Sequence, residues 1–276
     1  MSLVYAGIIS HAPGITGRAH LVKNTGLRDE FYKHLENQKN HIEESGADVL
    51  IVIGAEHFAN FFMDNMPPFC IGMSDKYYGP IEDPDWLKIA PTSVPGNANL
   101  SRQIIERLLH SVDVAYAEEW RFDHGIMVPL HFLTPKYDLP VVPVNINCQG
   151  PPLCPLHRVW SFGEALRQIC DELEERVAIV GTGGISHWPA TPDSGKINEK
   201  WDRKFLENLT AQRKKELLSY KDNEVLRSAG QGGFEIRTLI ATAAAAQGPG
   251  KIEFYTADLP IFAVGCTVVS FSLNSK

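Results

Sequence analysis

The stretch from Val49 to Phe58, VLIVIGAEHF, decides how this chain folds. Its first five residues are an unbroken run of aliphatic side chains, which is typical of a strand buried on both faces of a parallel sheet. Gly54 ends the run, so the loop at the carboxyl end of the strand carries Glu56 and His57. Ligands bind at this edge of an open α/β sheet, so His57 is a candidate site residue, although a loop histidine can equally have only a structural role.

Two other predicted strands end in the same way. The run over residues 3–9, LVYAGII, is followed by SHAPG, a turn that carries His11. The run over residues 177–180 ends in GTGGISHWP, which carries His187. Glu235 begins an alanine-rich helix directly behind two glycines, which let the backbone approach another group closely. Three of these features therefore need a common explanation: His11 after the first strand, His57 after the second, and Glu235 at the start of a helix.

The rest of the chain alternates between strand and helix patterns, with no internal repeat and no linker. Helices are predicted over residues 27–45, 97–110, 126–133, 156–175, 197–220 and 235–246, with another beginning near 222, and strands over residues 3–9, 49–53, 112–117, 139–146, 177–180, 252–256 and 261–271. The Pro-rich, aromatic segment 59–95 is predicted to be irregular with one or two short strands, and to form part of a pocket wall. We expect a single catalytic α/β domain over residues 1–276, with a central mixed sheet flanked by helices on both faces.

The composition restricts the classes of function. The 276 residues carry a net charge of −7, with a pI near 5.8 and no long basic run, so nucleic acid is not an expected partner. No apolar run approaches the roughly 20 residues that cross a bilayer, and no leader is recognisable, so we expect a cytoplasmic protein without a membrane partner. The five cysteines are scattered without a CxxC pair, so we expect reduced, mostly buried thiols and no cysteine zinc site.

The residue types of His11, His57 and Glu235 suit a metal ion. Two neutral imidazoles and one carboxylate hold non-haem Fe(II) on one face and leave its other positions open. The same set also suits zinc with an activated water, for which Glu56 or His187 would be the base of a hydrolase. Glu235 has a plainer explanation too, because the dipole of a helix favours a carboxylate in its first turn.

The other histidines differ in context. His124, within the DHG turn at 123–125, and His187 both lie at turns, where acid/base residues near a metal are expected. The GTGG turn before His187 lacks the spacing of a phosphate-binding loop and precedes no clear helix start, which disfavours phosphate binding. Surface positions are expected for the remaining histidines, which are His20, His34, His41, His110, His131 and His157.

These motifs resemble those of the class III extradiol ring-cleaving dioxygenases, the superfamily that includes the large catalytic subunit of protocatechuate 4,5-dioxygenase. The matching motifs occur in the family's order, as SHAP at 10–13, GAEH at 54–57, DHG at 123–125, GGISH at 183–187 and GFE at 233–235. By this resemblance His11, His57 and Glu235 are expected to bind Fe(II). It also implies that His187 is the catalytic base and that His124 is a second acid/base or oxygen-orienting residue.

The resemblance implies a reaction in which a small aromatic diol binds Fe(II) through both oxygens and reacts with O2. His187 would take a proton, and both atoms of O2 would enter a ring-opened semialdehyde acid. The ring could be protocatechuate-, gallate- or aminophenol-like. Arg18, Arg121 and Arg237 are candidates for recognising a substrate carboxylate, but each is equally explained as a structural ion-pair partner.

Two other functions stay open at this point. One is a zinc-dependent hydrolase that uses the same two-His one-Glu site, and the other is a non-catalytic binding protein of the same fold. The full set of ligand and acid/base positions argues against the second. Enzymes of this type are commonly oligomeric, so a homo-oligomer is expected. Some relatives are closed by a C-terminal extension or a small accessory subunit, and no segment here is assignable to either, so we expect a partner chain or residues 59–95 to close the pocket.

Overall fold

The computed structural model describes residues 3–274 and places most strands in one large mixed sheet. These strands are β1 (Leu3–Ile9), β2 (Val49–Gly54), β3 (Phe69–Gly72), β6 (Ala115–Ala117), β7 (Val141–Ile146), β8 (Val177–Thr182), β9 (Gly250–Thr256) and β10 (Cys266–Phe271). Their order across the sheet is β6-β3-β7-β2-β8-β1-β10-β9. The strands β4 (Lys76–Gly79) and β5 (Thr92–Pro95) form a separate antiparallel pair.

The centre of the sheet is parallel, and this arrangement creates the site. β8 lies between β1 and β2 and pairs in parallel with both, and β2 also pairs in parallel with β7. The outer strands β10, β9 and β3 pair antiparallel with their inner neighbours. The carboxyl ends of β1, β2 and β8 therefore meet at one edge of the sheet, where the loops that carry His11, His57 and His187 begin.

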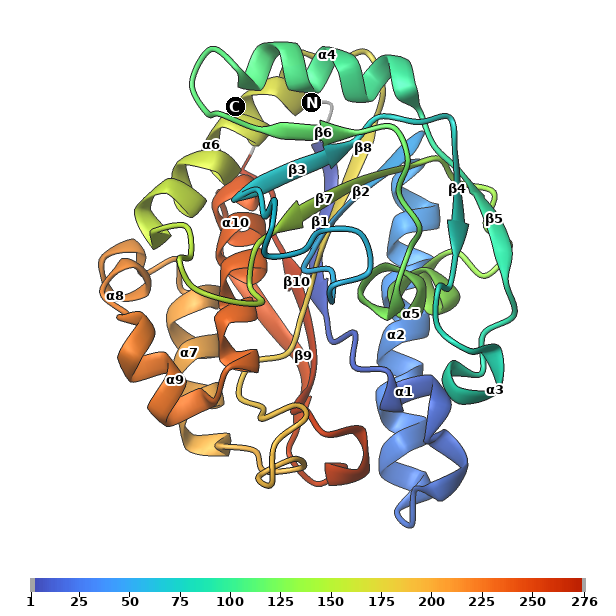
Figure 1. Cartoon of the computed structure of the whole chain (residues 1–276), viewed down its shortest axis with the longest axis vertical. Helices are drawn as coiled ribbons and strands as arrows, with labels where there is room; N and C mark the ends of the chain where they lie inside the picture. Colours follow the sequence, from blue (N-terminus) through green and yellow to red (C-terminus); the bar gives the residue numbers. More distant parts are fainter. Residues whose placement is uncertain (1–2, 275–276) are drawn as a thin grey trace.

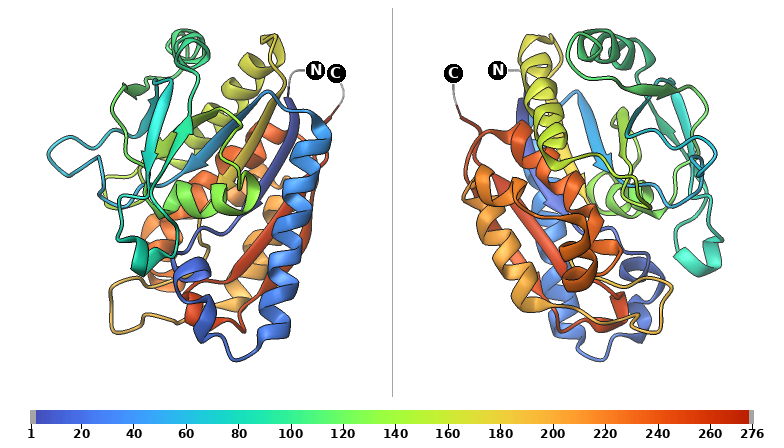
Figure 2. Two further views of the ribbon diagram at one scale, coloured as in Figure 1. Left: turned by 90° about the vertical axis from the view of Figure 1, so that its right-hand side faces the viewer. Right: turned by 60° about the vertical axis from the view of Figure 1, so that its left-hand side comes forward.

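Helices cover both faces of the sheet (Figure 1, Figure 2). The helices are α1 (Gly14–Gly17), α2 (Thr25–Ser45), α3 (Pro84–Leu87), α4 (Ala98–Leu108), α5 (His124–Leu133), α6 (Leu156–Glu172), α7 (Glu199–Thr210), α8 (Lys214–Leu218), α9 (Asp222–Ala229) and α10 (Ile236–Ala246). On one face α2 and α5 pack against the central strands, and on the other α10 does so, with α6 packed on α10. The expected α/β architecture with a mixed central sheet is confirmed.

The aliphatic run of β2 explains this two-sided packing. Its alternate residues Ile51 and Ile53 belong to the apolar core beneath α10 and α6, whereas Leu50 and Val52 belong to the core beneath α2 and α5. All four side chains are fully buried, as the pleat of a strand covered on both faces requires.

Some predicted element boundaries are wrong. The single helix expected over 197–220 is divided into α7 and α8, because Gln212 has a left-handed backbone (φ 54°) and its side-chain amide donates to the carbonyls of Ala243 and Gly248. The strand expected from residue 261 begins only at Cys266, because Pro260–Phe262 forms a 3₁₀ turn. Segment 59–95 contains β3, which joins the main sheet, as well as β4, α3 and β5.

Two expectations from composition can be compared with the fold. All five cysteines are free and buried, as expected. None of the helices described between residues 3 and 274 combines the length and apolar character needed to cross a membrane.

Candidate active site

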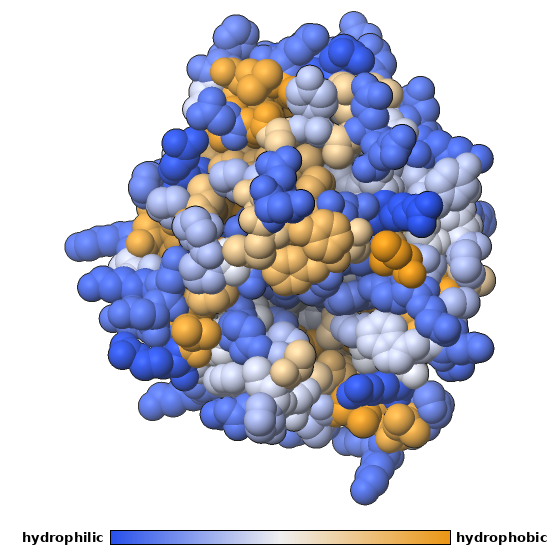
Figure 3. All heavy atoms as spheres, in the orientation of Figure 1, coloured by the Kyte–Doolittle hydropathy of each residue, from blue (hydrophilic) through white to orange (hydrophobic). Residues whose placement is uncertain are grey.

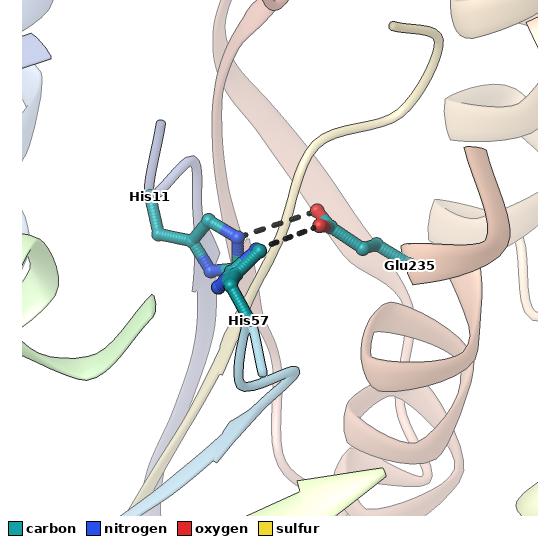
Figure 4. A group of neighbouring side chains, drawn as sticks. All are labelled: His11, His57 and Glu235. Carbon is teal, nitrogen blue, oxygen red and sulfur yellow. Dashed lines mark hydrogen bonds and ion pairs between the residues drawn. The ribbon is translucent and has the colours of Figure 1, made fainter. Parts of the chain in front are cut away.

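Three side chains from distant parts of the chain meet at the carboxyl edge of the sheet (Figure 4). His11 follows β1, His57 follows β2, and Glu235 ends the short helix η2 (Gly232–Glu235) that leads into α10. Nε2 of His11 lies 3.3 Å from Oε2 of Glu235, and Nε2 of His57 lies 3.3 Å from Oε1. One ligand atom from each residue lies within 4.8 Å of the others, so the three side chains can hold one metal ion.

The buried ring of His11 is held with Nε2 free to bind a metal. Its Nδ1 lies 2.9 Å from the hydroxyl oxygen of Thr182, the last residue of β8. That hydroxyl donates its only hydrogen to the carbonyl of Gly125 at 2.9 Å, so it can only accept from His11. Nδ1 therefore carries the proton, and the lone pair of Nε2 faces Glu235.

Asp123 orients the ring of His57 in the same way. Asp123 is buried at the N-cap of α5, where its Oδ1 accepts the backbone N–H of Gly125 at 3.0 Å. Its Oδ2 accepts the backbone N–H of His57 at 2.7 Å and lies 2.9 Å from Nδ1 of that ring. The carboxylate thus accepts the Nδ1 proton and leaves Nε2 of His57 directed at Glu235.

Charges around the three residues favour a bound cation. Burial alone lowers the pKa of His57, but the carboxylates of Asp123 and Glu235 outweigh burial and raise that pKa to about 10. Burial alone raises the pKa of Asp123, but His57 outweighs burial and lowers that pKa to about 2. The pKa of Glu235 is well below its usual value, because His11 and His187 outweigh the effect of burial. Two ionised carboxylates therefore face these rings at neutral pH.

A second group of metal-ligand types, His57, Asp123 and His124, also lies within 4.8 Å. It fits a metal less well, because the Asp123 carboxylate already accepts the N–H of Gly125 and two N–H groups of His57. In the first group, two imidazole Nε2 atoms and one carboxylate are available together. That donor set is the facial arrangement of two histidines and one carboxylate that suits non-haem Fe(II), so the residues fit such a metal.

His187 stands beside the same carboxylate, on the loop after β8. Its Nε2 lies 3.8 Å from Oε1 of Glu235, and its backbone N–H donates to the carbonyl of Ala229 at 2.8 Å. Gly184 and Gly232 make room for the ring, because a Cβ there would lie 2.5 Å and 2.3 Å, respectively, from its Cε1. Burial, only partly opposed by Glu235, lowers the pKa of His187, so the ring is neutral at pH 7 and can accept a proton.

His124 begins α5 and stacks on His57, with ring centroids 3.9 Å apart. Glu82 holds it in place, because its Oε1 accepts the backbone N–H of His124 at 2.9 Å and lies 2.6 Å from Nδ1 of the ring. Burial and the neighbouring His57 lower the pKa of His124. With its Nδ1 proton directed at Glu82, the neutral ring keeps Nε2 free to hydrogen-bond a ligand.

Glu56, considered from the sequence as the base of a hydrolase, does not serve the site. Its Oε2 accepts the backbone N–H groups of Ala59 at 2.7 Å and Asn60 at 2.8 Å, and its Oε1 accepts that of Phe61 at 3.2 Å. These bonds shape the loop after β2, and Glu56 is absent from the described residues that line the cavity around His57. The assignment of Glu56 as a candidate base is therefore wrong.

The three candidate ligands, His124 and His187 all line one cavity of about 550 Å³. One wall comes from the turn around α1 and from α3, where the Trp86 ring lies 6.5 Å from that of His124. Segment 59–95 contributes Asp85, Trp86 and Lys88 to the lining, so it forms part of the pocket wall as expected.

The family model described as catalytic LigB subunit of aromatic ring-opening dioxygenase matches residues 5–269. The chain belongs to this family. The resemblance to class III extradiol enzymes and the expected enzyme class, a ring-cleavage dioxygenase, are thereby confirmed. Membership implies a catalytic metal, and His11, His57 and Glu235 form a group that could hold one.

Named relatives of this ring-opening dioxygenase act on dihydroxylated rings. The chain is 33% identical over 199 residues to a 2,3-dihydroxyphenylpropionate/2,3-dihydroxicinnamic acid 1,2-dioxygenase 2 of Pseudomonas putida. This match covers 71% of the chain and 60% of that protein. The chain is 28% identical over 289 residues to the corresponding 1,2-dioxygenase of Rhodococcus jostii, covering 88% and 89% of the two chains. A crystal structure of an uncharacterized protein from Escherichia coli K12 shares the fold, with a TM-score of 0.61, 18% identity and coverage of 86% and 92%.

The residues that orient the histidines of the dioxygenase were missed by sequence reasoning. Asp123 had a usable signal, because Asp before a short helix is a common N-cap. Thr182, inside the GTGG turn, and Glu82 had none, because each acts on a ring that is distant in sequence. His20 is exposed, as expected, but it also lines the cavity.

Proposed function

We propose that this dioxygenase uses Fe(II), bound by His11, His57 and Glu235, to open a catecholic ring between a hydroxylated carbon and its neighbour outside the diol. One observation carries the proposal: two imidazoles, each held through Nδ1 so that Nε2 is directed at one ionised carboxylate, converge in a cavity that also contains His187 and His124. Fe(II) held by these residues would supply the positive charge that lowers the pKa of the diol and the redox chemistry that a reaction with O2 needs.

The chain's own residues would then manage the protons and the orientation of the substrate. Neutral His187 takes a proton from the substrate hydroxyl, which leaves an electron-rich ring. His124, held through Nδ1 by Glu82, presents Nε2 to the oxygen side of the site and can hydrogen-bond there. The walls that contain Trp86 bury the ring of the substrate and exclude water. The product is a ring-opened semialdehyde acid that contains both atoms of O2.

The substrate class is supported by the relatives, whose names specify rings with adjacent hydroxyl groups. We propose a catechol of this kind as the substrate, and a protocatechuate-, gallate- or aminophenol-like ring as the range to be tested. We also propose a cytoplasmic enzyme whose matched residues form one catalytic domain; the five buried cysteines, none of which is in a disulfide, are compatible with a reducing compartment.

A homo-oligomer is part of the same proposal. The loop after β2 exposes three large apolar side chains, Phe58, Phe62 and Met63. Figure 3 shows that apolar side chains gather near the middle of an otherwise largely hydrophilic face. Exposed apolar groups of this kind support a contact surface there, either with a second copy or with a small accessory subunit.

The first experiment is metal content and O2 uptake on anaerobically purified protein, with a panel of catechols and aminophenols. We expect near-stoichiometric iron, substrate-dependent O2 consumption and a yellow ring-opened product. Tightly bound zinc without O2 uptake from any compound would contradict the proposal and favour the hydrolase.

Metal binding should release a proton and strengthen as the pH rises. Because the pKa of His57 is raised to about 10, the metal-free ring is protonated at neutral pH, and the metal must displace the proton from Nε2. For one displaced proton, we expect the apparent Fe(II) affinity to increase about tenfold per pH unit between about pH 6 and 8. Anaerobic calorimetry in two buffers of different ionisation enthalpy counts the released protons, and an affinity independent of pH would contradict this model.

The substitution Asp123→Asn should weaken the metal site without removing a ligand. The amide keeps the N-cap geometry but loses the charge that holds the Nδ1 proton of His57. Partners of metal-bound histidines typically contribute 10- to 100-fold in affinity, so we expect a loss of about that size in an anaerobic Fe(II) titration. Asp258→Asn, on a surface turn after β9, is a matched control and should leave the affinity unchanged.

A further inference from the structure

The cavity contains an arginine whose guanidinium has no partner among residues 3–274. Arg18 lies between α1 and the next 3₁₀ turn, is exposed, and lines the cavity. Its backbone is fixed, because its N–H donates to Gly14 at 3.0 Å and its carbonyl accepts the N–H of Leu21 at 2.9 Å. No hydrogen bond or ion pair of the described chain occupies its side chain. Arg18 therefore has a backbone held in place and a guanidinium that is available to bind a ligand.

The other two arginines that the sequence offers for binding a substrate carboxylate do not line this cavity. Arg237 is 1% exposed, and its guanidinium donates to the Asp222 carboxylate at 2.5 Å and to the carbonyl of Cys154 at 3.0 Å. Arg121 lines a separate hollow beside β4 and β5. Of the three, Arg18 alone faces the cavity that contains the metal ligands.

The other charged groups that line the cavity do not neutralise the positive charge of Arg18. Lys88 lies 3.9 Å from the carboxylate of Asp85, so these two charges offset each other. The charge of Glu235 faces His11 and His57 and would be matched by the metal. The whole chain has a net charge of −7, so an anionic ligand needs a local positive group in order to bind.

The size of the cavity leaves room for more than a ring. A benzene-sized molecule fits a cavity of roughly 150 Å³, whereas this one has about 550 Å³. α1 and α3 are in direct backbone contact at this wall, because a Cβ on Gly17 would lie 2.3 Å from the carbonyl oxygen of Trp86. Arg18, the next residue, is thereby held on the wall that contains Trp86, and Trp86 in turn neighbours His124. A ring seated at the metal ligands can therefore extend a substituent along Trp86.

We propose that Arg18 binds a carboxylate on a side chain of the ring, so that the substrate class is an aromatic diol with an acidic substituent. The inference rests on the proposed function. A guanidinium forms paired, charge-assisted hydrogen bonds with a carboxylate, which fixes direction as well as adding affinity. With the diol at the triad and the acid at Arg18, the ring is anchored at both ends, and the position of the scissile bond is set.

The test compares 3-(2,3-dihydroxyphenyl)propionate with its methyl ester in the iron-loaded enzyme. For Arg18→Gln we expect kcat/KM for the acid to fall about 10- to 100-fold, mainly through KM, as for the loss of a hydrogen bond to a charged group. The value for the ester should change less than about twofold, and Arg18→Lys should recover part of the activity toward the acid. Arg102→Gln removes an exposed arginine from α4, outside the cavity, and should change neither value.

Several outcomes would overturn the assignment. Equal losses on acid and ester would show that Arg18 supports the fold of the pocket, and unchanged values on both would show that it does not contact the substrate. Either result leaves the proposed function intact, because the ester is still cleaved with O2 uptake. If the wild-type enzyme cleaved neither these two compounds nor any catechol or aminophenol of the panel, the proposed function would fail. Anaerobic calorimetry of both compounds on wild type and Arg18→Gln would then still decide whether Arg18 selects the acid.

Discussion

The substitution His57→Ala is expected to abolish Fe(II) binding and turnover while the chain still folds. His57 supplies one of two imidazole ligands, and the remaining His11 and Glu235 cannot complete a three-ligand face. Because loss of an orienting partner alone costs 10- to 100-fold in metal affinity, loss of a ligand should cost more than about 100-fold. Anaerobic metal analysis after gel filtration measures the bound iron, and O2 uptake measures the activity.

A matched control separates the loss of a ligand from the loss of any histidine. His41→Ala removes an exposed histidine from α2, away from the cavity, and should retain iron and activity. The far-ultraviolet circular dichroism of His57→Ala should match that of wild type, because the core of β2 is formed by its aliphatic residues and not by His57. Retention of stoichiometric iron by His57→Ala would remove this residue from the ligand set.

The positions of the candidate ligands could be predicted because each directly follows an element that the sequence marks clearly. The apolar runs of β1, β2 and β8 are short and end at Gly or Ser, so the loops that carry His11, His57 and His187 follow directly from the strands. Parallel pairing of these strands then brings the loops to one edge. The sequence alone thus shows that each histidine follows a strand, and the order of the strands in the sheet shows that the three loops lie together.

The orienting contacts could not be predicted in the same way, because they join residues that are far apart in the chain. Glu82 reaches His124 across 42 positions, and Asp123 reaches His57 across 66. Nothing local distinguishes Glu82 from an ordinary surface glutamate. The break between α7 and α8 has a similar origin, because the side chain of Gln212 is held by carbonyls near the end of α10. Hydrogen bonds between residues far apart in the chain therefore determine the orientation of the histidine rings and the break between α7 and α8, which the periodic patterns do not predict.

The substitution His187→Phe is expected to retain iron and lose turnover. The ring of His187 lies 3.8 Å from Glu235 and between two glycines, and phenylalanine removes both nitrogen atoms while keeping an aromatic ring at this position. Loss of a general base typically costs about 10²- to 10⁴-fold in kcat, and we expect a fall in that range with bound iron unchanged. Anaerobic metal analysis and O2 uptake with the same catechol provide both measurements on one preparation.

The pH profile distinguishes a base from a residue that only shapes the pocket. Burial lowers the pKa of His187, so the ring is neutral above that pKa and becomes protonated, and inactive as a base, as the pH falls through it. The wild-type rate should therefore fall on the acid side below about pH 6.5, the ordinary pKa of histidine, and His187→Phe should lose that acid limb. His157→Phe, an exposed position on α6, is the control and should keep the wild-type profile. Full activity with an unchanged acid limb in His187→Phe would assign the base to another group, and His124 would be the next candidate, because its neutral ring lines the same cavity.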